Sequence, residues 1–399
     1  MTSTITHPAL RGRSRVPAQA VRRRRLVVPG VATGSFWVLA ALITVLNMIG
    51  LIMVLSASSV ASVREGHGAW SYFEKQAMWT TLGVPALLLC LMVSMDFWRK
   101  FVKAALAVSI AGLCAVLAVG HEVNGATRWV GAGPIQLQPS EFAKFGLLLY
   151  VADVLDRRSR DIDDWRQGLR PVVIVLAVVA GLVMLQPNLG TTIIIAAMVL
   201  SMLWAAGAPI LGIGITTIAG AIAAIGAVAY TPFRRTRFLR FLNPWADPSN
   251  TGLQNIQSMV GLANGGLLGR GLGRSTAKWG FLPYAHTDFI FAIIGEEFGL
   301  VGALTVVLLF AGLGMVGAFI ALRARDRFSM LVATGITAWF TVQALMNIGA
   351  VIGVMPITGV PLPFVSFGGS SLLTTLAATG MLLNIARHPA PPARTRPAR

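Results

Sequence analysis

The stretch DFIFAIIGEEFGLVGALTVVLLFAGLGMVGAFIA, residues 288–321, has all of its charge in its first ten residues, at Asp288, Glu296 and Glu297. A helix needs about 20 apolar residues to cross a bilayer, so this stretch can span one and also tilt or project from it. A carboxylate near the centre of a membrane helix costs about 2.5–3.5 kcal/mol and needs a partner, water or a function. The sequence therefore predicts a membrane helix that begins beside an acidic site.

The composition of the whole chain is that of a membrane protein. Hydrophobic residues make up 55% of the 399 residues, charged residues make up 12%, and the mean hydropathy is +0.71. These values exclude an ordinary soluble surface. Ten apolar runs have a suitable length and predict an all-α polytopic fold with about ten transmembrane helices. The runs lie near residues 35–56, 77–95, 102–120, 140–155, 171–186, 189–207, 209–229, 288–321, 328–353 and 365–386.

The positions of Lys and Arg in the short loops predict the orientation. These residues lie in the N-terminal tail, after the second, fourth and eighth runs, and in the C-terminal tail. Ten spans place all of these segments on one side, and positive charge is retained in the cytoplasm. We therefore expect both termini to be cytoplasmic and the large loop at about 230–287 to be extracytoplasmic. The Arg-rich segment 1–34 and the Pro- and Arg-rich segment 388–399 are typical of disordered tails, which leaves 35–387 as the membrane domain.

The large loop is itself basic. Its positive residues are Arg234, Arg235, Arg237, Arg240, Arg270, Arg274 and Lys278. Long loops escape the charge rule for topology, so these residues do not contradict the predicted orientation. Their charge suits an anionic lipid or a pyrophosphate. The glycine-rich segment 265–274, with Arg270 and Arg274, is either a phosphate cradle or only a flexible loop. Nucleic acid is a poor partner, because the basic residues divide between both membrane faces without a compact, aromatic-rich domain.

Two further segments around the loop have distinctive patterns. Residues Leu253, Ile256, Val260 and Ala263 recur at helical spacing and predict an amphipathic helix on the membrane surface. Residues 356–371 are uncharged but rich in Pro and Gly. Irregular backbone at membrane depth is tolerated only where it is buried in protein or lines a cavity, so we expect a re-entrant wall here.

Polar residues also mark the starts of two apolar runs. Pro139 and Ser140 are helix-start signals that place Glu141 and Lys144 one turn apart on the same face. The pair either neutralises itself as buried charge or orients another carboxylate and holds a phosphate. Asn188 joins two runs with almost no loop between them, and it can cap the following helix or bind substrate.

Asp288 has two interpretations from its local pattern. An acidic residue in the first turn of a helix is favoured by the helix dipole and needs no other role. Alternatively, a carboxylate at the membrane boundary is a candidate general base. The neighbouring His286 is a potential hydrogen-bond partner or an interfacial residue, and alone it is weak evidence for a site.

Six polar motifs follow one another along the predicted membrane domain. They are NGATRW at 124–129, QPSEFAK at 138–144, QPNLGT at 186–191, NPWADP at 243–248, AHTDFIFAIIGEE at 285–297 and PLPFVSFGGSS at 361–371. In this order and topology they resemble the SEDS family (shape, elongation, division and sporulation). The amino-acid sequences of the motifs are closer to the cell-division branch, FtsW, than to the elongation branch, RodA. The resemblance covers about residues 35–387.

The resemblance implies a peptidoglycan glycosyltransferase that polymerises lipid II on the outer face of the cytoplasmic membrane at the septum. It also implies a class B penicillin-binding protein and other divisome membrane proteins as partners. Asp288 matches the essential loop aspartate of the family, Glu141 and Lys144 match its Glu and Lys, and Arg128 matches its loop arginine. Many members have Asp where this chain has Asn188, which weakens any requirement for a second carboxylate there.

The implied chemistry needs a base for a sugar hydroxyl and positive charge for a pyrophosphate leaving group. We assign Asp288 as the base and Arg128, Lys144, Arg270 and Arg274 as pyrophosphate ligands. Further polar residues of the motifs are candidate substrate contacts, namely Glu141, Asn188, His286, Ser366 and Ser370. A divalent cation such as Mg²⁺ or Mn²⁺ could bridge carboxylate and pyrophosphate, although no ligand cluster in the sequence indicates one.

Three alternative functions remain open at this point. A lipid II flippase would use the same buried polar groups to line a translocation path, but it should show polar residues through the full membrane depth. Here the distinctive motifs concentrate on the outer side. A division scaffold would recruit partners through its Arg-rich tail, and Asp288 could then be replaced without loss. An elongation polymerase of the RodA type would share the chemistry.

Overall fold

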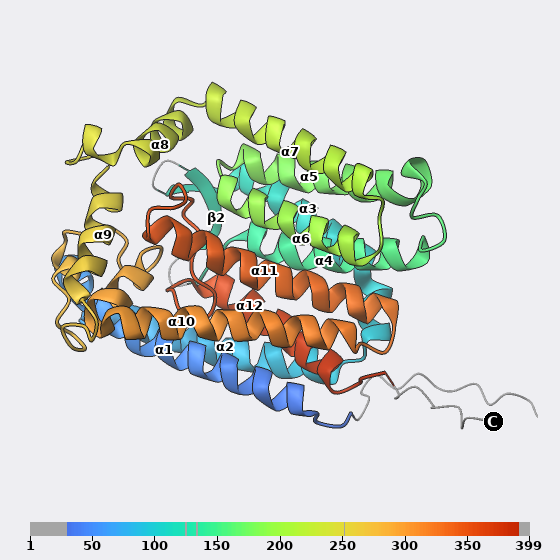
Figure 1. Ribbon diagram of the computed structural model, residues 1–399, viewed down its shortest axis with the longest axis horizontal. Helices are drawn as coiled ribbons and strands as arrows, with labels where there is room; N and C mark the ends of the chain where they lie inside the picture. Colours follow the sequence, from blue (N-terminus) through green and yellow to red (C-terminus); the bar gives the residue numbers. More distant parts are fainter. Residues whose placement is uncertain (1–29, 124–125, 133–134, 251, 391–399) are drawn as a thin grey trace, which may run out of the picture.

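The structure, a computed structural model, describes residues 30–390 except 124–125, 133–134 and 251 (Figure 1). Within these residues ten long helices match the ten predicted runs one for one, so the predicted all-α fold is confirmed. The first two motif residues and the outer parts of both predicted tails lie outside the described residues. The ten helices are α1 Gly34–Arg64, α2 Ser71–Met92, α3 Met95–Val119, α4 Pro139–Arg157, α5 Arg170–Leu185, α6 Leu189–Ala205, α7 Ile210–Tyr230, α10 Ile290–Leu322, α11 Arg327–Val351 and α12 Gly369–Ala386.

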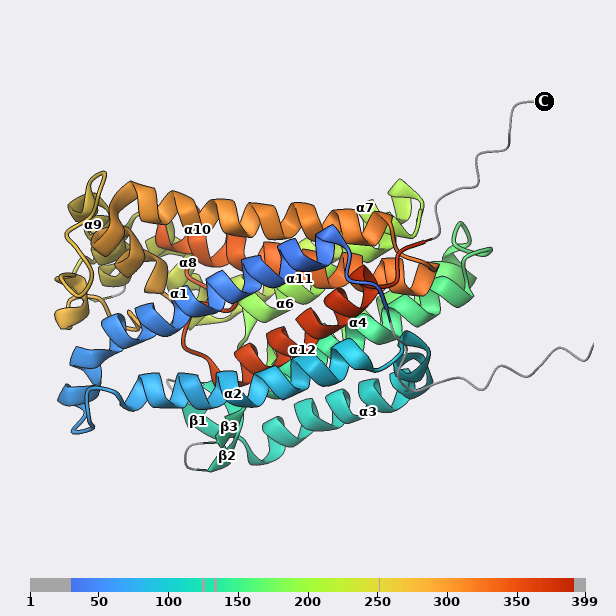
Figure 2. The ribbon, with the colours of Figure 1, turned by 90° about the horizontal axis from the view of Figure 1, so that it is seen from below.

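Length and hydropathy distinguish these helices from one another. In the described part of the chain, seven segments are long and apolar enough to cross a membrane: α1, α3, α5 with the π-helical turn Trp165–Leu169 before it, α7, α10, α11 and α12. Helix α6 is apolar but has only 17 residues. Helices α2 and α4 have charged residues near their starts, and they lie among the other helices all the same (Figure 2).

Both ends of the described chain lie at the same end of the helix bundle, which we call the tail end (Figure 1). There the Val31 amide donates to the Arg387 carbonyl at 3.1 Å, and the Thr33 hydroxyl donates to the Ala386 carbonyl at 2.9 Å. The chain therefore crosses the bundle an even number of times. The short connections after α2, α4 and α10, which have basic residues in them or in the adjoining helix turns, also lie at the tail end, as the count of ten predicts.

The opposite end of the bundle, which we call the loop end, contains the segment between α7 and α10 (Figure 1). This segment folds into two helices, α8 Pro232–Leu242 and α9 Leu253–Gly265, and two 3-10 turns, Pro244–Ala246 and Ala277–Trp279. Three short antiparallel strands lie at the same end, in the order β1 His121–Val123, β2 Ala126–Ala132 and β3 Ile135–Leu137. Every polar motif that follows α3 therefore has at least one residue at the loop end.

The centre of the bundle is built from α4, α11 and α12, whose side chains are mostly buried. Small residues allow helices to approach closely, as α12 and its neighbour α2 do. A Cβ added to Gly380 of α12 would lie 2.1 Å from the carbonyl oxygen of Leu87 in α2, a distance that real Cβ atoms do not reach. Helix α7 lies at the periphery instead, and Gly212 is its one buried residue. The apolar surface of α7 is thus left for lipid.

The segment between α11 and α12 confirms the predicted re-entrant wall. A Cβ added to Gly50, midway along α1, would lie 2.4 Å from the carbonyl oxygen of Phe364. The segment thus returns to the middle of the bundle before α12 begins. Its backbone groups are satisfied internally: the Leu362 amide donates to Ser366 Oγ, and the Pro361 carbonyl accepts from Gln343. This pairing is what irregular backbone requires at membrane depth.

The helix predicted near 288–321 is confirmed as α10, with two differences in detail. It begins at Ile290, and it is interrupted at Gly299, where φ is 68° and ψ is −163°. Only glycine adopts such angles without strain. At the interruption, the Leu300 and Val301 amides donate to the carbonyls of Gly266 and Leu267 at 2.9 and 3.2 Å. The glycine-rich loop therefore pairs with the break in α10.

The helix predicted around residues 253–263 is confirmed as α9, but its packing differs from the expectation. Its buried face contains Ile256 of the predicted apolar pattern together with Asn255, Ser258 and Gly261, and the Ser258 hydroxyl donates to the Val351 carbonyl of α11 at 3.0 Å. Val260 and Ala263 are exposed. The side that packs on the protein is thus mostly small and polar, with Ile256 as its large apolar residue. That the exposed apolar side rests on a membrane surface stays a prediction.

Candidate active site

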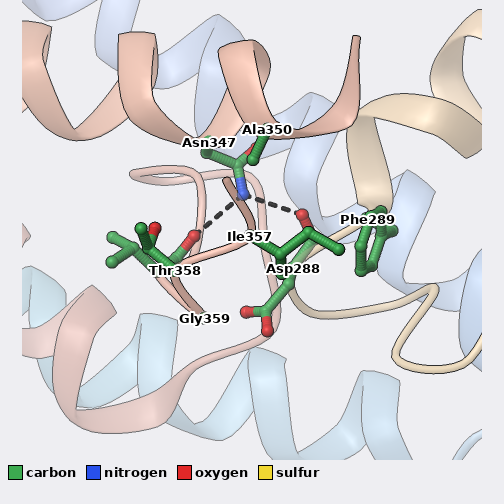
Figure 3. A pocket seen from close by; sticks show the side chains of 8 residues that line it. Asp288, Phe289, Asn347, Ala350, Ile357, Thr358 and Gly359 are labelled. Carbon is green, nitrogen blue, oxygen red and sulfur yellow. Dashed lines mark hydrogen bonds between the residues drawn. The ribbon is translucent and has the colours of Figure 1, made fainter. Parts of the chain in front are cut away.

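Asp288 lies in the turn that precedes α10, at the loop end of the bundle (Figure 3). Its carbonyl oxygen accepts a hydrogen bond from Asn347 Nδ2 of α11 at 2.8 Å. Its carboxylate points toward the re-entrant segment, where a Cβ added to Gly359 would lie 3.7 Å from Oδ2. Helix α10 has no acidic residue in its first turn, and its N-cap Phe289 forms no side-chain cap. The interpretation of Asp288 as a first-turn helix residue is therefore wrong.

Arg128 of β2 approaches the same place from another part of the chain. Its Nη1 would lie 4.0 Å from the Cβ added to Gly359. Its Nε donates to the Gln186 carbonyl at 3.1 Å, and its Nη2 donates to the Pro187 carbonyl. These two bonds fix the guanidinium at the turn between α5 and α6. A permanently charged guanidinium and a carboxylate thus both approach Gly359, which has no side chain.

A small pocket lies beside Asp288. Asp288, Asn347, Thr358 and Gly359 contribute to its wall, with Phe289 and Ala350 on the apolar side (Figure 3). The centre of a water molecule can move within a volume of about 10 Å³ in this pocket, so the pocket holds about one water. The pocket therefore accommodates a single polar group, and a disaccharide substrate must lie largely outside it.

The predicted pairing of Glu141 with Lys144 is present but faces inward. Lys144 Nζ lies 2.9 Å from Glu141 Oε2, and the two side chains are 0% and 3% exposed. Lys144 also donates to Gln343 Oε1 at 3.0 Å and lies 4.5 Å from the ring centre of Trp339. Lys144 has no surface for a pyrophosphate in this conformation. The structure therefore favours the interpretation as a self-neutralising buried pair over direct substrate contact by either residue.

Asn188 occupies the position of a helix cap. Its Oδ1 accepts from the Thr191 amide at 3.3 Å at the start of α6, and its side chain is buried. Next to it, a Cβ added to Gly190 would lie 2.4 Å from Val360 Cγ2 and 2.8 Å from Thr358 Cβ. The turn that contains Asn188 thus packs on the re-entrant segment and holds Arg128. This placement agrees with capping and does not bring Asn188 to the pocket surface.

Arg270 and Arg274 lie elsewhere at the loop end. Arg270 Nη1 is 3.3 Å from Glu296 Oε1. Glu296 lies roughly 9 Å along α10 from Ile290, where the helix begins after the Asp288 turn. The amides of Arg270 and Gly271 donate to the carbonyls of Glu296 and Glu297 at 3.0 and 2.9 Å. Those amides cannot also bind a phosphate, so the predicted backbone cradle is wrong at both residues. The Arg274 side chain is exposed on the same loop.

Glu296 and Glu297 form a buried cluster to which the sequence assigned no role. Glu296 accepts from Thr276 Oγ1 at 2.7 Å and from the amides of Thr276 and Ala277 at 3.0 and 3.2 Å. Glu297 accepts from Ser56 Oγ at 2.7 Å and pairs with Lys278 Nζ at 3.2 Å. The cluster ties the loop to α1 and α10. The signal was two adjacent acids in an apolar helix, which need partners when buried.

His286 has a packing role at the border of the site. Its ring lies 4.5 Å from the Tyr72 ring and 5.9 Å from the Phe367 ring, and its carbonyl accepts from the Phe367 amide at 3.0 Å. Burial lowers the pKa of His286 to about 4, and the nearby Glu65 carboxylate opposes this only in part. The imidazole is therefore neutral at pH 7. It joins the Asp288 turn to the re-entrant segment.

Ser366 and Ser370 are buried and are used inside the protein. Ser366 Oγ accepts from the Leu362 amide at 2.9 Å, and Ser370 Oγ accepts from the Gln138 amide at 3.3 Å. Both hydroxyls thus stabilise the re-entrant segment and its junction with α4. Neither side chain has exposed surface in this conformation, so the predicted contact with substrate is not available to them.

The sequence interpretation missed a stripe of polar residues on α11. Trp339, Gln343 and Asn347 are spaced four residues apart in a helix that is otherwise mostly apolar, so they share one face. That spacing in a membrane helix was a usable signal, because buried polar groups there are costly and usually functional. This face points at Lys144, at the re-entrant segment and at Asp288.

Among the described residues, no three His, Cys, Asp or Glu side chains lie close enough together to hold a metal ion. A Mg²⁺ or Mn²⁺ ion at Asp288 therefore stays a prediction, and no step of the chemistry below is derived through a metal.

Comparison with known proteins identifies the architecture. A family model for FtsW, RodA and SpoVE, described as "Cell cycle protein", matches residues 36–390. "Probable peptidoglycan glycosyltransferase FtsW" of Geobacter metallireducens is 37% identical over 345 residues, 85% of this chain and 91% of the relative. "Stage V sporulation protein E" of Bacillus subtilis is 38% identical over 353 residues, 88% of this chain and 96% of the relative.

Two solved structures are similar as well. A chain from the structure reported as "Structural coordination of polymerization and crosslinking by a peptidoglycan synthase complex" has a TM-score of 0.74 and 29% identity, and 88% of this chain covers 97% of it. The rod shape determining protein RodA of Thermus thermophilus has a TM-score of 0.66 and 27% identity, and 88% of this chain covers 96% of it. The resemblance seen in the six motifs is confirmed, and the chain belongs to the FtsW/RodA/SpoVE family, also called SEDS.

Proposed function

We propose that this chain is a peptidoglycan glycosyltransferase that polymerises lipid II during cell division, with Asp288 as its general base. One observation carries the assignment: Asp288 and Arg128 converge on Gly359 beside a pocket that accommodates one polar group. The relatives named as probable peptidoglycan glycosyltransferases are 35–40% identical over most of the chain. Several of them are named FtsW, which supports a division role over an elongation role.

The reaction divides between the two charged residues. The Asp288 carboxylate takes the proton of a GlcNAc 4-hydroxyl while that oxygen attacks the anomeric carbon of the donor sugar. The bond from that carbon to the undecaprenyl pyrophosphate breaks, and the leaving group departs with the electron pair. Arg128 supplies fixed positive charge for the developing anion. Displacement without a covalent intermediate inverts an α-linked donor to a β-linked product.

The predicted orientation supports a reaction on the extracytoplasmic side of the membrane. Arg99 near the start of α3, Arg157 at the end of α4 and Arg323 directly after α10 lie beside the short connections of the tail end. Positive charge in short loops is retained in the cytoplasm, which supports cytoplasmic termini and an extracytoplasmic loop end. The pyrophosphate-linked substrate would then meet Asp288 at the outer membrane surface, and the septal location follows from the proposed division role.

A class B penicillin-binding protein is the proposed partner. The similar chain with the TM-score of 0.74 comes from a peptidoglycan synthase complex that coordinates polymerisation with crosslinking. A partner that crosslinks the product would bind where the glycan emerges, at the loop end. Other divisome membrane proteins are proposed as further partners on the same functional ground.

The test is glycan polymerisation by the purified full-length chain with its penicillin-binding partner, supplied with lipid II. Wild-type protein should form polymer and Asp288→Ala should not. A parallel measurement of lipid II scrambling in liposomes separates the flippase alternative, for which scrambling without polymerisation is expected. A scaffold would support neither reaction, and its function in cells would survive Asp288→Ala.

A further inference from the structure

Asp288 needs a fixed position, because a general base acts only within hydrogen-bond reach of its proton. Backbone bonds at His286 and Phe289 hold part of its turn, but the N-cap of α10 forms no side-chain cap. Instead, one nitrogen of Asn347 donates to two backbone oxygens, those of Asp288 and Val360, each at 2.8 Å (Figure 3). The two carbonyls also fix the orientation of the amide, because only its nitrogen can donate to both.

The Asn347 side chain bonds to both walls of the pocket. The Asp288 bond holds the turn before α10, and the Val360 bond holds the re-entrant segment directly after Gly359. Gly359 is the residue that Asp288 Oδ2 and Arg128 Nη1 approach. Asn347 is 3% exposed, so solvent does not compete for these bonds. Loss of the amide would therefore remove one bond from the turn of the base and one from the wall that faces it, and loosen both together.

Gln343, one turn earlier on α11, extends the same support. Its Nε2 donates to the Pro361 carbonyl at 2.9 Å, next to the oxygen that Asn347 holds. Its Oε1 accepts from Lys144 Nζ at 3.0 Å and from Trp339 Nε1 at 2.8 Å. The buried Lys144 thus reaches the pocket wall through one amide, without exposing its charge.

We propose that Asn347 and Gln343 are positioning residues that fix Asp288 against the Gly359 wall, and that Glu141 and Lys144 act through them. The Glu141–Lys144 ion pair fixes the orientation of the Gln343 amide. Gln343 and Asn347 then fix the positions of two consecutive carbonyls of the pocket wall, those of Pro361 and Val360. Asn347 also fixes the position of the Asp288 turn. Substrate contact by Lys144 is then unnecessary. This inference rests on the proposed function of Asp288.

The chain contains a closely matched control. Asn384 of α12 is also 3% exposed, and its Nδ2 also donates to two backbone carbonyls, those of Cys90 and Val93, at 3.1 and 2.6 Å. These carbonyls lie at the tail end of α2, away from the pocket. Replacing either asparagine with alanine removes the same bonds from the same kind of environment, and only Asn347 is near the base.

The experiment compares Asn347→Ala, Asn384→Ala and wild type as full-length proteins with the penicillin-binding partner. Melting temperature, KM for lipid II and kcat are measured for each. We expect both variants to melt at similarly lowered temperatures. We expect kcat of Asn347→Ala to fall at least tenfold with KM within twofold of wild type, while Asn384→Ala stays within threefold of wild-type kcat.

Gln343→Glu supplies a second, independent variant. It keeps the acceptor for Lys144 and Trp339 but removes the donor to the Pro361 carbonyl, so its kcat should fall while its KM stays near wild type. If Asn347→Ala cannot be recovered as folded protein, the isosteric Asn347→Asp replaces it. Wild-type kcat in the Asn347 and Gln343 variants, or an equal loss in Asn384→Ala, would overturn the inference. Inactivity of the wild-type protein itself would instead contradict the proposed function.

Discussion

Arg128 Nη1 and Asp288 Oδ2 converge on Gly359, at 4.0 and 3.7 Å from the position that a Cβ would take on that glycine. The two residues are 160 positions apart and come from a strand and a turn, while the glycine belongs to the re-entrant segment. The space between them is therefore defined by three separate elements. It is the most direct structural sign of a reaction centre in the described part of the chain.

The first prediction concerns Gly359 itself, whose φ is +70°. Gly359→Ala should destabilise the protein by about 1 kcal/mol through backbone strain. It should also lower polymerisation at least tenfold, because an added methyl group would contact both the base and the guanidinium and take space beside them. Gly66→Ala is the matched control: φ there is +79° and no atom lies within 4 Å of an added Cβ. Equal activity in the two variants would show that the space at Gly359 has no role.

The second prediction concerns the buried ion pair. Lys144→Met leaves the Glu141 carboxylate buried without its cation, and removing one partner of such a pair costs about 3–5 kcal/mol. The double variant Glu141→Gln with Lys144→Met should regain most of that stability, because no buried charge remains. Thermal melting in detergent checks both variants. A wild-type melting temperature for Lys144→Met alone would contradict the burial of the pair.

The third prediction concerns the cluster that anchors the large loop. Glu297→Ala removes the acceptor of Ser56 and leaves the buried Lys278 without its carboxylate. We expect the segment 266–280 to open and become sensitive to limited proteolysis, with a loss of about 3 kcal/mol or more in stability. Glu74→Ala, at an exposed position of α2, is the control and should leave the protease pattern unchanged. Identical patterns for the two variants would argue against an anchoring role.

The fourth prediction is a pH dependence from His286. Its pKa is lowered to about 4 in the folded protein, below its usual 6.5, mainly by burial. Between these values the unfolded chain binds a proton that the folded protein excludes, so stability falls as the pH drops from 6.5 toward 4. Melting temperatures across that range should decline less steeply for His286→Gln than for wild type. Parallel curves would mean that another group sets the acid sensitivity.

Much of the fold was predictable because a membrane requires spans of apolar residues and tolerates irregular backbone only where it is buried in protein or lines a cavity. Apolar length gave the ten spans, and the uncharged run of helix breakers at 356–371 gave the re-entrant segment. The break at Gly299 was not predictable, because Gly302 and Gly312 occur in the same apolar pattern and remain helical. The difference arises from the distant glycine-rich loop that pairs with the α10 backbone at that point.

The sequence predicted which residues belong to the candidate site better than it predicted what each of them does. The spacing of Glu141 and Lys144 correctly gave a shared face, but it could not show that this face points at Gln343, which is 199 residues from Lys144. Motif matching likewise selected Arg128 and Asp288 without revealing that Gly359 joins them. Roles depended on contacts between distant segments, and local pattern contains no information about those contacts.

The most direct measurement is polymerisation of lipid II by purified Asp288→Asn protein together with its penicillin-binding partner. The amide keeps the size of the carboxyl group but cannot accept the proton of the sugar hydroxyl. We predict a melting temperature close to wild type, retained binding of lipid II and a loss of polymer formation of at least a hundredfold. Polymerisation at the wild-type rate would contradict the assignment of Asp288 as the general base.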